Sequence, residues 1–188
     1  MKILRTQLDD VLLIEPAAYA DDRGWFMESF NERRFENDVA ALGRPVPRRF
    51  VQDNHSVSRK GVLRGLHYQI GPHVQGKLLR VVRGAIYDVA VDIRRASAGF
   101  GRWTAVELSA DNRRQLWVPE GHAHGFLALS DDTQVLYKTT DYYAPESERS
   151  IAWNDPTLSV RWPANADEVV LNAKDAAAPA FAGNPDLL

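Results

Sequence analysis

Cysteine is absent from this sequence of 188 residues. Its absence excludes a disulfide framework, a cysteine nucleophile and a thiolate metal site, so histidine and carboxylate side chains are the only strong metal ligands left. Long apolar runs are also lacking. Nowhere do about 18 apolar residues follow one another, and the charged N-terminus has no apolar core of signal-peptide length. We therefore expect no membrane partner and a cytoplasmic location.

An excess of one charge is lacking as well. The 23 basic residues nearly balance the 25 acidic residues, and the two kinds are mixed along the chain. Because no basic stripe is available for a phosphate backbone, nucleic acid is disfavoured as a partner. The length fits one compact unit with a proper apolar core, and no internal repeat divides it. We expect a single domain over residues 1–188.

Short segments with strand periodicity make up much of the chain. In Ala85–Ile93, one face of the predicted strand holds Ala85, Tyr87, Val89, Val91 and Ile93. Asp88 and Asp92 lie on the other face. Similar runs, separated by clusters of Gly, Pro, Ser, Asp and Asn, are Val11–Ile14, Leu78–Val82, Thr104–Leu108, Gln115–Val118, Gly125–Leu129 and Val135–Thr139. Many short strands with regular turns are typical of a sandwich or barrel.

One early stretch predicts a helix. Phe35, Val39 and Leu42 follow an i, i+4, i+7 pattern after the candidate N-cap Asn31, and a glycine and a proline then stop it. The tail from Asn172 to Leu188 is rich in Ala, Pro and Gly, so propensity predicts an irregular segment with at most a short helical patch. The predicted fold is mainly β, a jelly-roll double-sheet barrel with a few short helices, whose interior can hold a ligand.

A first cluster of reactive side chains lies in Gln52–Ser56 and Gly61–Gln69. In an extended L-R-G-L-H-Y-Q segment, His67 shares a face with Gly65 and lies opposite Arg64. A lone histidine is more often an ordinary core or surface residue than a catalytic one. Gly65 shifts this weighting towards function, because a glycine removes bulk where a ligand approaches.

The second cluster, Trp117–Phe126, contains His122 and His124 on one face of a predicted strand. Histidines with this spacing begin many metal sites in small double-sheet barrels, but such sites need a third and usually a fourth ligand. No carboxylate follows His124 before Asp131. We therefore expect a metal-free pocket.

The third cluster places Tyr137 on the inward face of a strand, with Tyr142 and Tyr143 at the end of that strand. Buried tyrosines are usually core residues with a satisfied hydroxyl. Tyr137 is a candidate functional residue only if the other reactive residues lie near it.

Four motifs, in this order, resemble those of the dTDP-4-dehydrorhamnose 3,5-epimerase family: L-R-G-L-H-Y-Q (Leu63–Gln69), Q-G-K-L (Gln75–Leu78), P-E-G-H-A-H-G-F (Pro119–Phe126) and A-K-D-A-A-A-P (Ala173–Pro179). The resemblance runs from about Val11 to Pro179. It implies a cupin-like jelly roll, a homodimer, and neither a metal nor another cofactor. It also implies a nucleotide-sugar substrate, dTDP-4-dehydro-6-deoxy-D-glucose, converted to dTDP-4-dehydro-L-rhamnose in dTDP-L-rhamnose biosynthesis.

The resemblance further implies roles for individual residues. His67 matches the family's base and Asp175 the carboxylate paired with it. Tyr137 matches the acid, and Lys77 matches the cation beside the ketone oxygen. Positions that match nucleotide-sugar-binding residues are Arg23, Glu28, Gln52, Asn54, Arg64, His124, Glu148 and Lys174, with Tyr143 matching the aromatic residue that stacks on thymine. Asp53 lies between two of these positions and is counted with them.

Inversion at C3 and C5 of a 4-keto sugar requires three kinds of group. Removing a proton from either carbon makes an enolate, so a base must lie on one face, a proton donor on the other, and a cation at the carbonyl oxygen. Histidine suits the base, because its ordinary pKa is roughly 6.5 and a carboxylate on its second nitrogen fixes the tautomer. A lysine suits the oxygen and a protonated tyrosine suits the return of the proton.

The diphosphate of the implied substrate requires fixed positive charge. Arginine forks bind phosphate bidentately, which favours Arg23 and Arg64 over scattered lysines. Arg23 and Glu28 lie in the segment R-G-W-F-M-E-S-F. By the resemblance, we expect this strand to cross onto the neighbouring subunit.

One departure from the family pattern is visible, because His122 stands where an aromatic residue usually precedes Ala-His-Gly. It leaves open a metal-dependent cupin enzyme that uses His67, His122 and His124. A sugar-binding module that kept the pocket and lost the reaction is the non-enzymatic alternative. Relatives that invert only C3 or only C5 share the same catalytic residue types.

Overall fold

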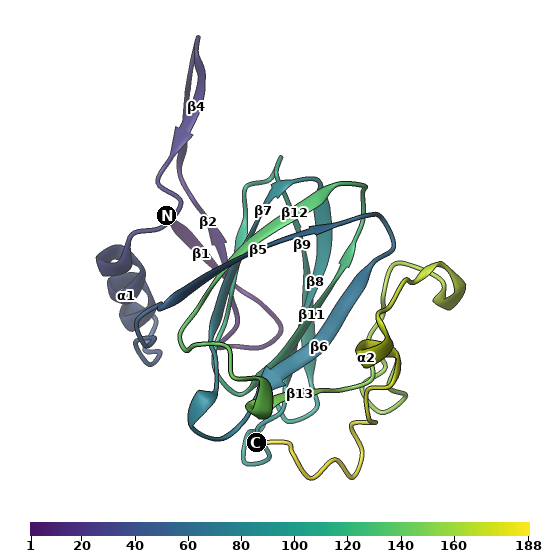
Figure 1. The fold of residues 1–188 in the computed structure, drawn as a ribbon. Helices are drawn as coiled ribbons and strands as arrows, with labels where there is room; N and C mark the ends of the chain where they lie inside the picture. Colours follow the sequence, from purple (N-terminus) through teal and green to yellow (C-terminus); the bar gives the residue numbers. More distant parts are fainter.

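A computed structural model describes residues 1–188, and its thirteen strands form two large sheets and one hairpin (Figure 1). In spatial order, the six-stranded sheet contains β1 (Lys2–Arg5), β2 (Leu12–Glu15), β10 (Gln115–Val118), β7 (Lys77–Arg83), β12 (Thr133–Thr139) and β5 (Gln52–Ser58). The five-stranded sheet contains β13 (Glu148–Ser150), β6 (Leu63–Gln69), β11 (His122–Ala128), β8 (Ala85–Asp92) and β9 (Trp103–Ser109). The hairpin consists of β3 (Ala18–Asp21) and β4 (Gly24–Met27), and it extends away from the body in Figure 1.

All paired strands are antiparallel, and from β5 onward nearly every connection crosses from one sheet to the other. This crossing pattern is that of a jelly-roll double sheet. The predicted fold class, mainly β with a few short helices, is confirmed. None of the helices is long and apolar enough to span a membrane.

The predicted early helix is α1 (Glu32–Ala41), and Asn31 caps it by accepting a hydrogen bond from the backbone N–H of Arg34 at 3.1 Å. The second helix, α2 (Ala173–Ala176), is a single turn near the C-terminus. Three short 3₁₀ turns complete the set: η1 (Gly71–His73), η2 (Pro145–Ser147) and η3 (Ala166–Glu168).

Apolar residues are buried in three separate clusters. The first fills the space between the two sheets and includes Leu79, Val81, Leu116 and Phe126. The second lies under α1, where Phe35 and Val39 pack on Leu12, Ile14 and Trp117 from the outer face of the six-stranded sheet. The third covers the outer face of the five-stranded sheet, where the C-terminal segment contributes Ile151, Leu158, Phe181 and Leu187. Each sheet is thus covered on both faces.

The alternation in β8 decides which face of that strand meets the barrel interior. Val89 and Val91 pack outward under the C-terminal segment, whereas Ile86 and Ala90 face the other sheet. Asp88 and Asp92 share the inward face, and both are almost fully buried. The polar face of β8 is therefore the interior face, which is why this barrel has buried carboxylates to partner cavity groups.

A bulge in β6 changes the faces expected there. His67 lies opposite His124, but Arg64 lies opposite Phe126, so three steps along β6 match two steps along β11. Arg64 and His67 consequently line the same cavity. The interpretation that they lie on opposite faces is wrong, because it assumed unbroken alternation.

Gly65 occupies the bulge with a φ of +127°. A Cβ atom built there would meet the Cα of Gly125 at 2.6 Å and the backbone oxygen of His124 at 2.8 Å. The interpretation that Gly65 makes room for a ligand is therefore wrong, since the backbone of β11 occupies that space.

We expect Gly65→Ala to lower the free energy of unfolding by about 2–4 kcal/mol, because both the backbone conformation and the approach of β11 exclude a side chain. Gly71→Ala is the matched control, because Gly71 also has a positive φ but has open space around it. Its expected loss is about 1 kcal/mol. Urea unfolding of both variants measures the difference, and equal losses would contradict the steric argument.

Candidate active site

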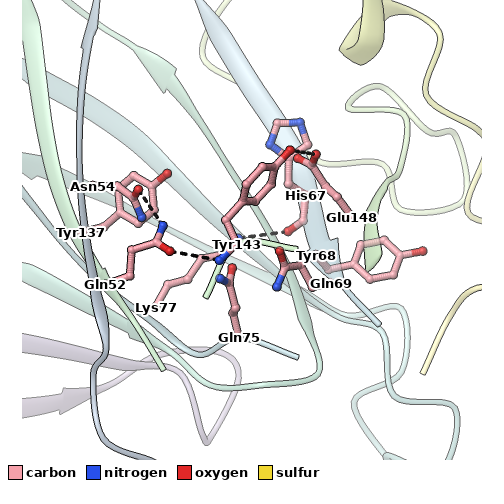
Figure 2. Close-up of a pocket in the computed structure, with 10 residues that line it drawn as sticks. All are labelled: Gln52, Asn54, His67, Tyr68, Gln69, Gln75, Lys77, Tyr137, Tyr143 and Glu148. Carbon is pink, nitrogen blue, oxygen red and sulfur yellow. Dashed lines mark hydrogen bonds between the residues drawn. The ribbon is translucent and has the colours of Figure 1, made fainter. Parts of the chain in front are cut away.

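A cavity of about 310 Å³ opens at one end of the barrel, and a second lobe of about 230 Å³ shares three of its residues. The shared residues are His67 from β6, Lys77 from β7 and Tyr137 from β12. Figure 2 shows Tyr137 and His67 on opposite sides of the pocket, with Lys77 between and below them. Both sheets therefore contribute reactive groups to one space.

His67 is hydrogen-bonded to a buried carboxylate from the tail. Its Nε2 lies 2.6 Å from Oδ1 of Asp175, whose side chain is only 1% exposed. The other carboxylate oxygen of Asp175 accepts from the backbone N–H of Gly65 at 3.3 Å. With Nε2–H donated to the carboxylate, Nδ1 of His67 carries the lone pair that can act as a base.

Asp175 reaches His67 because α2, a single turn of helix, lies beside β6 (Figure 1). The side chain of Asn172 caps α2 and accepts from the backbone N–H of Asp175 at 2.7 Å. The tail predicted to be irregular thus supplies one of the most buried carboxylates in the molecule.

Lys77 lies between the sheets and donates from Nζ to the backbone oxygen of His67 at 3.3 Å. Burial lowers the pKa of Lys77 to about 8, an effect that the carboxylates of Glu148 and Asp88 partly oppose. The ammonium is therefore held in a site of low polarity, where a developing negative charge on a ligand oxygen would be strongly stabilised.

Tyr137 faces the cavity from β12, opposite Asn54 on one side and Leu79 on the other. Burial raises the pKa of its phenol above the ordinary value of 10.0. The phenol is therefore protonated at neutral pH, and because its hydroxyl has no hydrogen-bond partner in the protein, it is free to interact with a ligand.

His124 lies next to His67 across β6 and β11 and is paired with Asp88. Its Nε2–H donates to Oδ1 of Asp88 at 2.5 Å, and both side chains are buried. Burial lowers the pKa of His124, although Asp88 opposes this effect. A neutral ring that donates from Nε2 leaves Nδ1 as an acceptor for a ligand hydroxyl.

Polar residues from β5, β13, α2 and the loop at Tyr143 surround the mouth of the larger lobe. Gln52 donates to Asn54 at 2.9 Å and accepts from the backbone N–H of Tyr143 at 3.0 Å. The Tyr143 hydroxyl donates to Glu148 at 2.7 Å, and Lys174 forms an ion pair with the same carboxylate. Burial would raise the pKa of Glu148, but these two partners hold it below the ordinary value.

Arg64 lines the smaller lobe and donates to the Ser58 hydroxyl and to the Val57 backbone oxygen, both at 3.1 Å. No carboxylate neutralises it. Its charge is therefore available to an anionic ligand.

Four predicted binding residues line neither lobe, although one of them, Lys174, reaches the mouth through its ion pair with Glu148. Arg23 is at the tip of the hairpin, is 90% exposed and pairs only with Asp21. Glu28 lies near Asn31 and Arg34, beside α1. Asp53 points to the outer face of its sheet, where Lys138 binds it at 2.9 Å, because strand alternation separates it from its two neighbours.

The histidines of the metal alternative are also separated. The side chain of His122 is fully buried outside the cavity, with Nδ1 at 3.1 Å from the Pro119 oxygen and Nε2 at 3.4 Å from Asp10. No group of three or more His, Asp or Glu side chains is arranged to hold a metal ion. The combination of His67, His122 and His124 in one ligand set is therefore not supported by their positions.

The structure adds cavity residues that sequence reasoning missed. These are Asp88, which partners His124, and the lining residues Ser56, Gln69, Gln75 and Asn172. Asp88 could have been found from its pattern, because it interrupts an otherwise apolar strand. Gln69 and Gln75 lie in two of the motifs and Ser56 lies in the first cluster, but none of them was singled out as a site residue, and Asn172 carries no sequence signal.

The fold and the cavity together define a class, that of jelly-roll enzymes that move protons by acid–base catalysis. A phenol, an imidazole with a carboxylate partner and a buried ammonium face one enclosed space, and this combination suits proton transfer beside a carbonyl group.

Comparison with known proteins identifies the family within this class. Residues 5–183 match the family model described as dTDP-4-dehydrorhamnose 3,5-epimerase. The chain is 54% identical over 182 residues to the dTDP-4-dehydrorhamnose 3,5-epimerase of Pseudomonas aeruginosa, covering 97% of each chain. The chain belongs to the dTDP-4-dehydrorhamnose 3,5-epimerase family, and it is a sugar-nucleotide epimerase.

Solved structures agree with this assignment. The dTDP-6-deoxy-D-glucose-3,5-epimerase of Legionella pneumophila, solved with dTDP-4-keto-L-rhamnose, has a TM-score of 0.89 and 52% identity, with 96% of this chain and 92% of that chain covered. A 3′-monoepimerase of Streptomyces bikiniensis, solved with dTDP-quinovose, has a TM-score of 0.83 and 36% identity, with 95% and 87% covered. The cupin-like fold implied by the sequence motifs is confirmed.

We expect activity to fall as pH rises through about 8, because the pKa of Lys77 is about 8 and only the protonated form can stabilise an enolate. Tyr137 does not cause this loss, since burial places its pKa above 10.0. A pH profile of kcat/KM, which reports the free enzyme, measures the effect. Lys77→Arg keeps a permanent charge, so its profile should lack the fall near pH 8 even if its maximum rate is lower.

Proposed function

We propose that the chain inverts C3 and C5 of dTDP-4-dehydro-6-deoxy-D-glucose with His67 as base, Tyr137 as acid and Lys77 at the ketone oxygen. One observation carries this assignment: the three side chains line the same cavity, with the histidine and the tyrosine on opposite sides (Figure 2). Removal and return of a proton on opposite faces of a ring requires that arrangement.

In each inversion, Nδ1 of His67 takes the proton from the carbon beside the ketone. The electron pair of the broken C–H bond moves onto the carbonyl oxygen, where Lys77 stabilises the enolate. At one of the two carbons, Tyr137 then gives its proton to the opposite face of that carbon, and at the other carbon water supplies this proton. His67 releases its proton to solvent and Tyr137 takes one up, so both groups are restored for the next inversion.

Asp175 supports the base throughout this cycle. It holds the tautomer in which Nδ1 is unprotonated, and it stabilises the imidazolium that forms when the proton is taken. A buried carboxylate is effective here, because the interaction with imidazolium is little screened by water.

The nucleotide part of the substrate fits the polar mouth. Arg64 offers charge to the diphosphate, and His124 offers an acceptor for a sugar hydroxyl. Gln52, Asn54, Tyr143, Glu148 and Lys174 surround the entrance, where a base and a ribose would lie. Tyr143 is 54% exposed, which leaves its ring accessible for stacking on thymine.

Inversion of a single carbon is the second candidate. The Streptomyces bikiniensis 3′-monoepimerase shares the fold, but its identity to this chain is 36%, against 39–55% for 3,5-epimerases. The higher similarity favours action at both carbons. A sugar-binding module without activity is disfavoured by the intact set of acid, base and cation.

We expect His67→Ala and Asp175→Asn each to lower kcat by about 10² to 10⁴, because both remove proton abstraction. Tyr137→Phe should abolish inversion at one carbon while leaving exchange with solvent deuterium, since the base is intact and only the opposite-face donor is lost. Proton NMR of the nucleotide sugar in heavy water follows exchange and stereochemistry at each carbon.

Three results separate the candidates in that experiment. Exchange at C3 and C5 in the wild type supports the 3,5-epimerase, whereas exchange at one carbon supports the single-carbon alternative. Binding without exchange at either carbon supports the binding module. A Tyr137→Phe variant that matches the wild type would show that another group is the acid.

We also propose that a second copy of this chain completes the site with Arg23 and Glu28 from its hairpin. Tyr19, Trp25 and Phe26 are 68%, 53% and 71% exposed, which is an unusual concentration of exposed aromatic rings. Arg23 lines neither lobe of the cavity in its own chain. A homodimer with exchanged hairpins would account for both facts.

Mixing two inactive variants tests the exchange. His67→Ala and Arg23→Ala should each be weakly active alone, but unfolding and refolding them together in equal amounts should restore roughly a quarter of wild-type activity, because half of the dimers then contain one intact site. Light scattering gives the oligomeric state. Mixing two preparations of His67→Ala is the control, and the absence of any recovery in the mixed variants would rule out a shared site.

A further inference from the structure

Asp175 lies on a very short helix. Its helix α2 is one turn long, and the tail from Ala177 onward contains no further helix or strand. A single turn of helix is not stable by itself. Other contacts must therefore hold the carboxylate on His67.

Asp155 makes such a contact and has no role in the proposed mechanism. It is 2% exposed, and its carboxylate accepts three backbone hydrogen bonds. Oδ1 accepts from Thr157 at 2.8 Å and Leu158 at 3.0 Å, while Oδ2 accepts from Phe181 at 2.8 Å. One buried carboxylate thus joins its own loop to the tail that follows α2.

The segment that carries Asp155 is itself paired with the strand that carries His67. Ser150 lies opposite His67, and Ile151 exchanges two backbone hydrogen bonds with Leu66 at 2.9 and 3.2 Å. Next along the chain, the N–H of Ala152 donates to the oxygen of Pro179 at 2.8 Å. A continuous series of contacts therefore connects the strand that carries His67, through Ile151 and Asp155, to the tail that follows Asp175.

The tail is also anchored by packing at the same point. Phe181 is 6% exposed and packs in the cluster that contains Leu66, Val91 and Ile151. Its ring lies 5.1 Å from that of Phe100. The hydrogen bond from Phe181 to Asp155 and the burial of its ring thus fix the tail six residues after Asp175.

We propose that Asp155 is a positioning residue for catalysis, which holds α2 so that the carboxylate of Asp175 stays hydrogen-bonded to His67. It lines neither lobe of the cavity, so it acts only through the tail. This inference rests on the proposed role of the His67–Asp175 pair.

The test is a double-mutant cycle of Asp155→Asn and Asp175→Asn, with kcat and thermal unfolding measured for each protein. Asparagine keeps the size of the side chain, and its oxygen can still accept from the N–H groups of Thr157 and Leu158. Its NH₂ group then faces the N–H of Phe181, and two donors cannot form the hydrogen bond that joins the loop to the tail. We expect Asp155→Asn to lower kcat by about 10- to 100-fold, the cost of a small displacement of a catalytic group.

The double variant should have the kcat of Asp175→Asn within about twofold, because displacement of a carboxylate that is already missing has no further effect. Asp186→Asn is the matched control. Asp186 holds the same tail through Arg149 at 2.9 Å, but it is partly exposed and lies farther along the chain. Its kcat should equal that of the wild type.

Two results would overturn the inference. One is a folded Asp155→Asn protein with wild-type kcat, and the other is a double variant in which the two losses multiply, as a purely structural effect would produce. If Asp175→Asn itself kept wild-type kcat, the proposed role of the pair would fail first. If Asp155→Asn does not fold, Asp155→Glu tests the same link, because it keeps both acceptor oxygens but displaces them by one methylene group. It must show a lower kcat that is likewise non-additive with Asp175→Asn.

Discussion

The hydrogen bond between His67 and Asp175 joins residues 108 positions apart, and the arrangement of the site depends on it. A carboxylate that is 1% exposed is stable only when its oxygens have partners, since burial of an unpaired charge costs several kcal/mol. Both partners of Asp175 come from β6, namely the His67 ring and the Gly65 N–H. The carboxylate therefore requires the bulge as much as it requires the histidine, because the bulge sets where Gly65 and His67 lie relative to each other.

Apolar packing on the outer faces of the two sheets allows part of the barrel interior to be polar. The outer faces of the two sheets are covered by α1 and by the C-terminal segment, so the sheets do not depend on the interior alone for apolar burial. Inside, an apolar cluster fills part of the space between the sheets, and the buried polar groups Asp88 and His124 lie beside it. These two groups are paired with each other, because unpaired groups in a space of low polarity are costly.

The reactive groups of the site come from two kinds of segment. Lys77, Tyr137 and His67 come from strands inside large sheets, whose ladders hold them firmly. The carboxylate comes from a single turn of helix and is held mainly by side-chain and packing contacts instead. Lys77 also bonds to the backbone of His67, so the two sheets are tied together at the reactive centre.

Local patterns predicted much of the fold, and the resemblance to a family pointed to the candidate site residues. Alternation predicted strands such as β8 and β10, and spacing with a capping asparagine predicted α1, because periodicity and caps depend on neighbours in sequence. The motifs around His67, Lys77, Tyr137 and Asp175 pointed to residues that do lie together. Only the tertiary structure decided the bulge at Gly65, which face of β8 meets the interior, and the burial of the tail. Each of these depends on which distant backbone packs against the residue, and no local pattern in the chain carries that information.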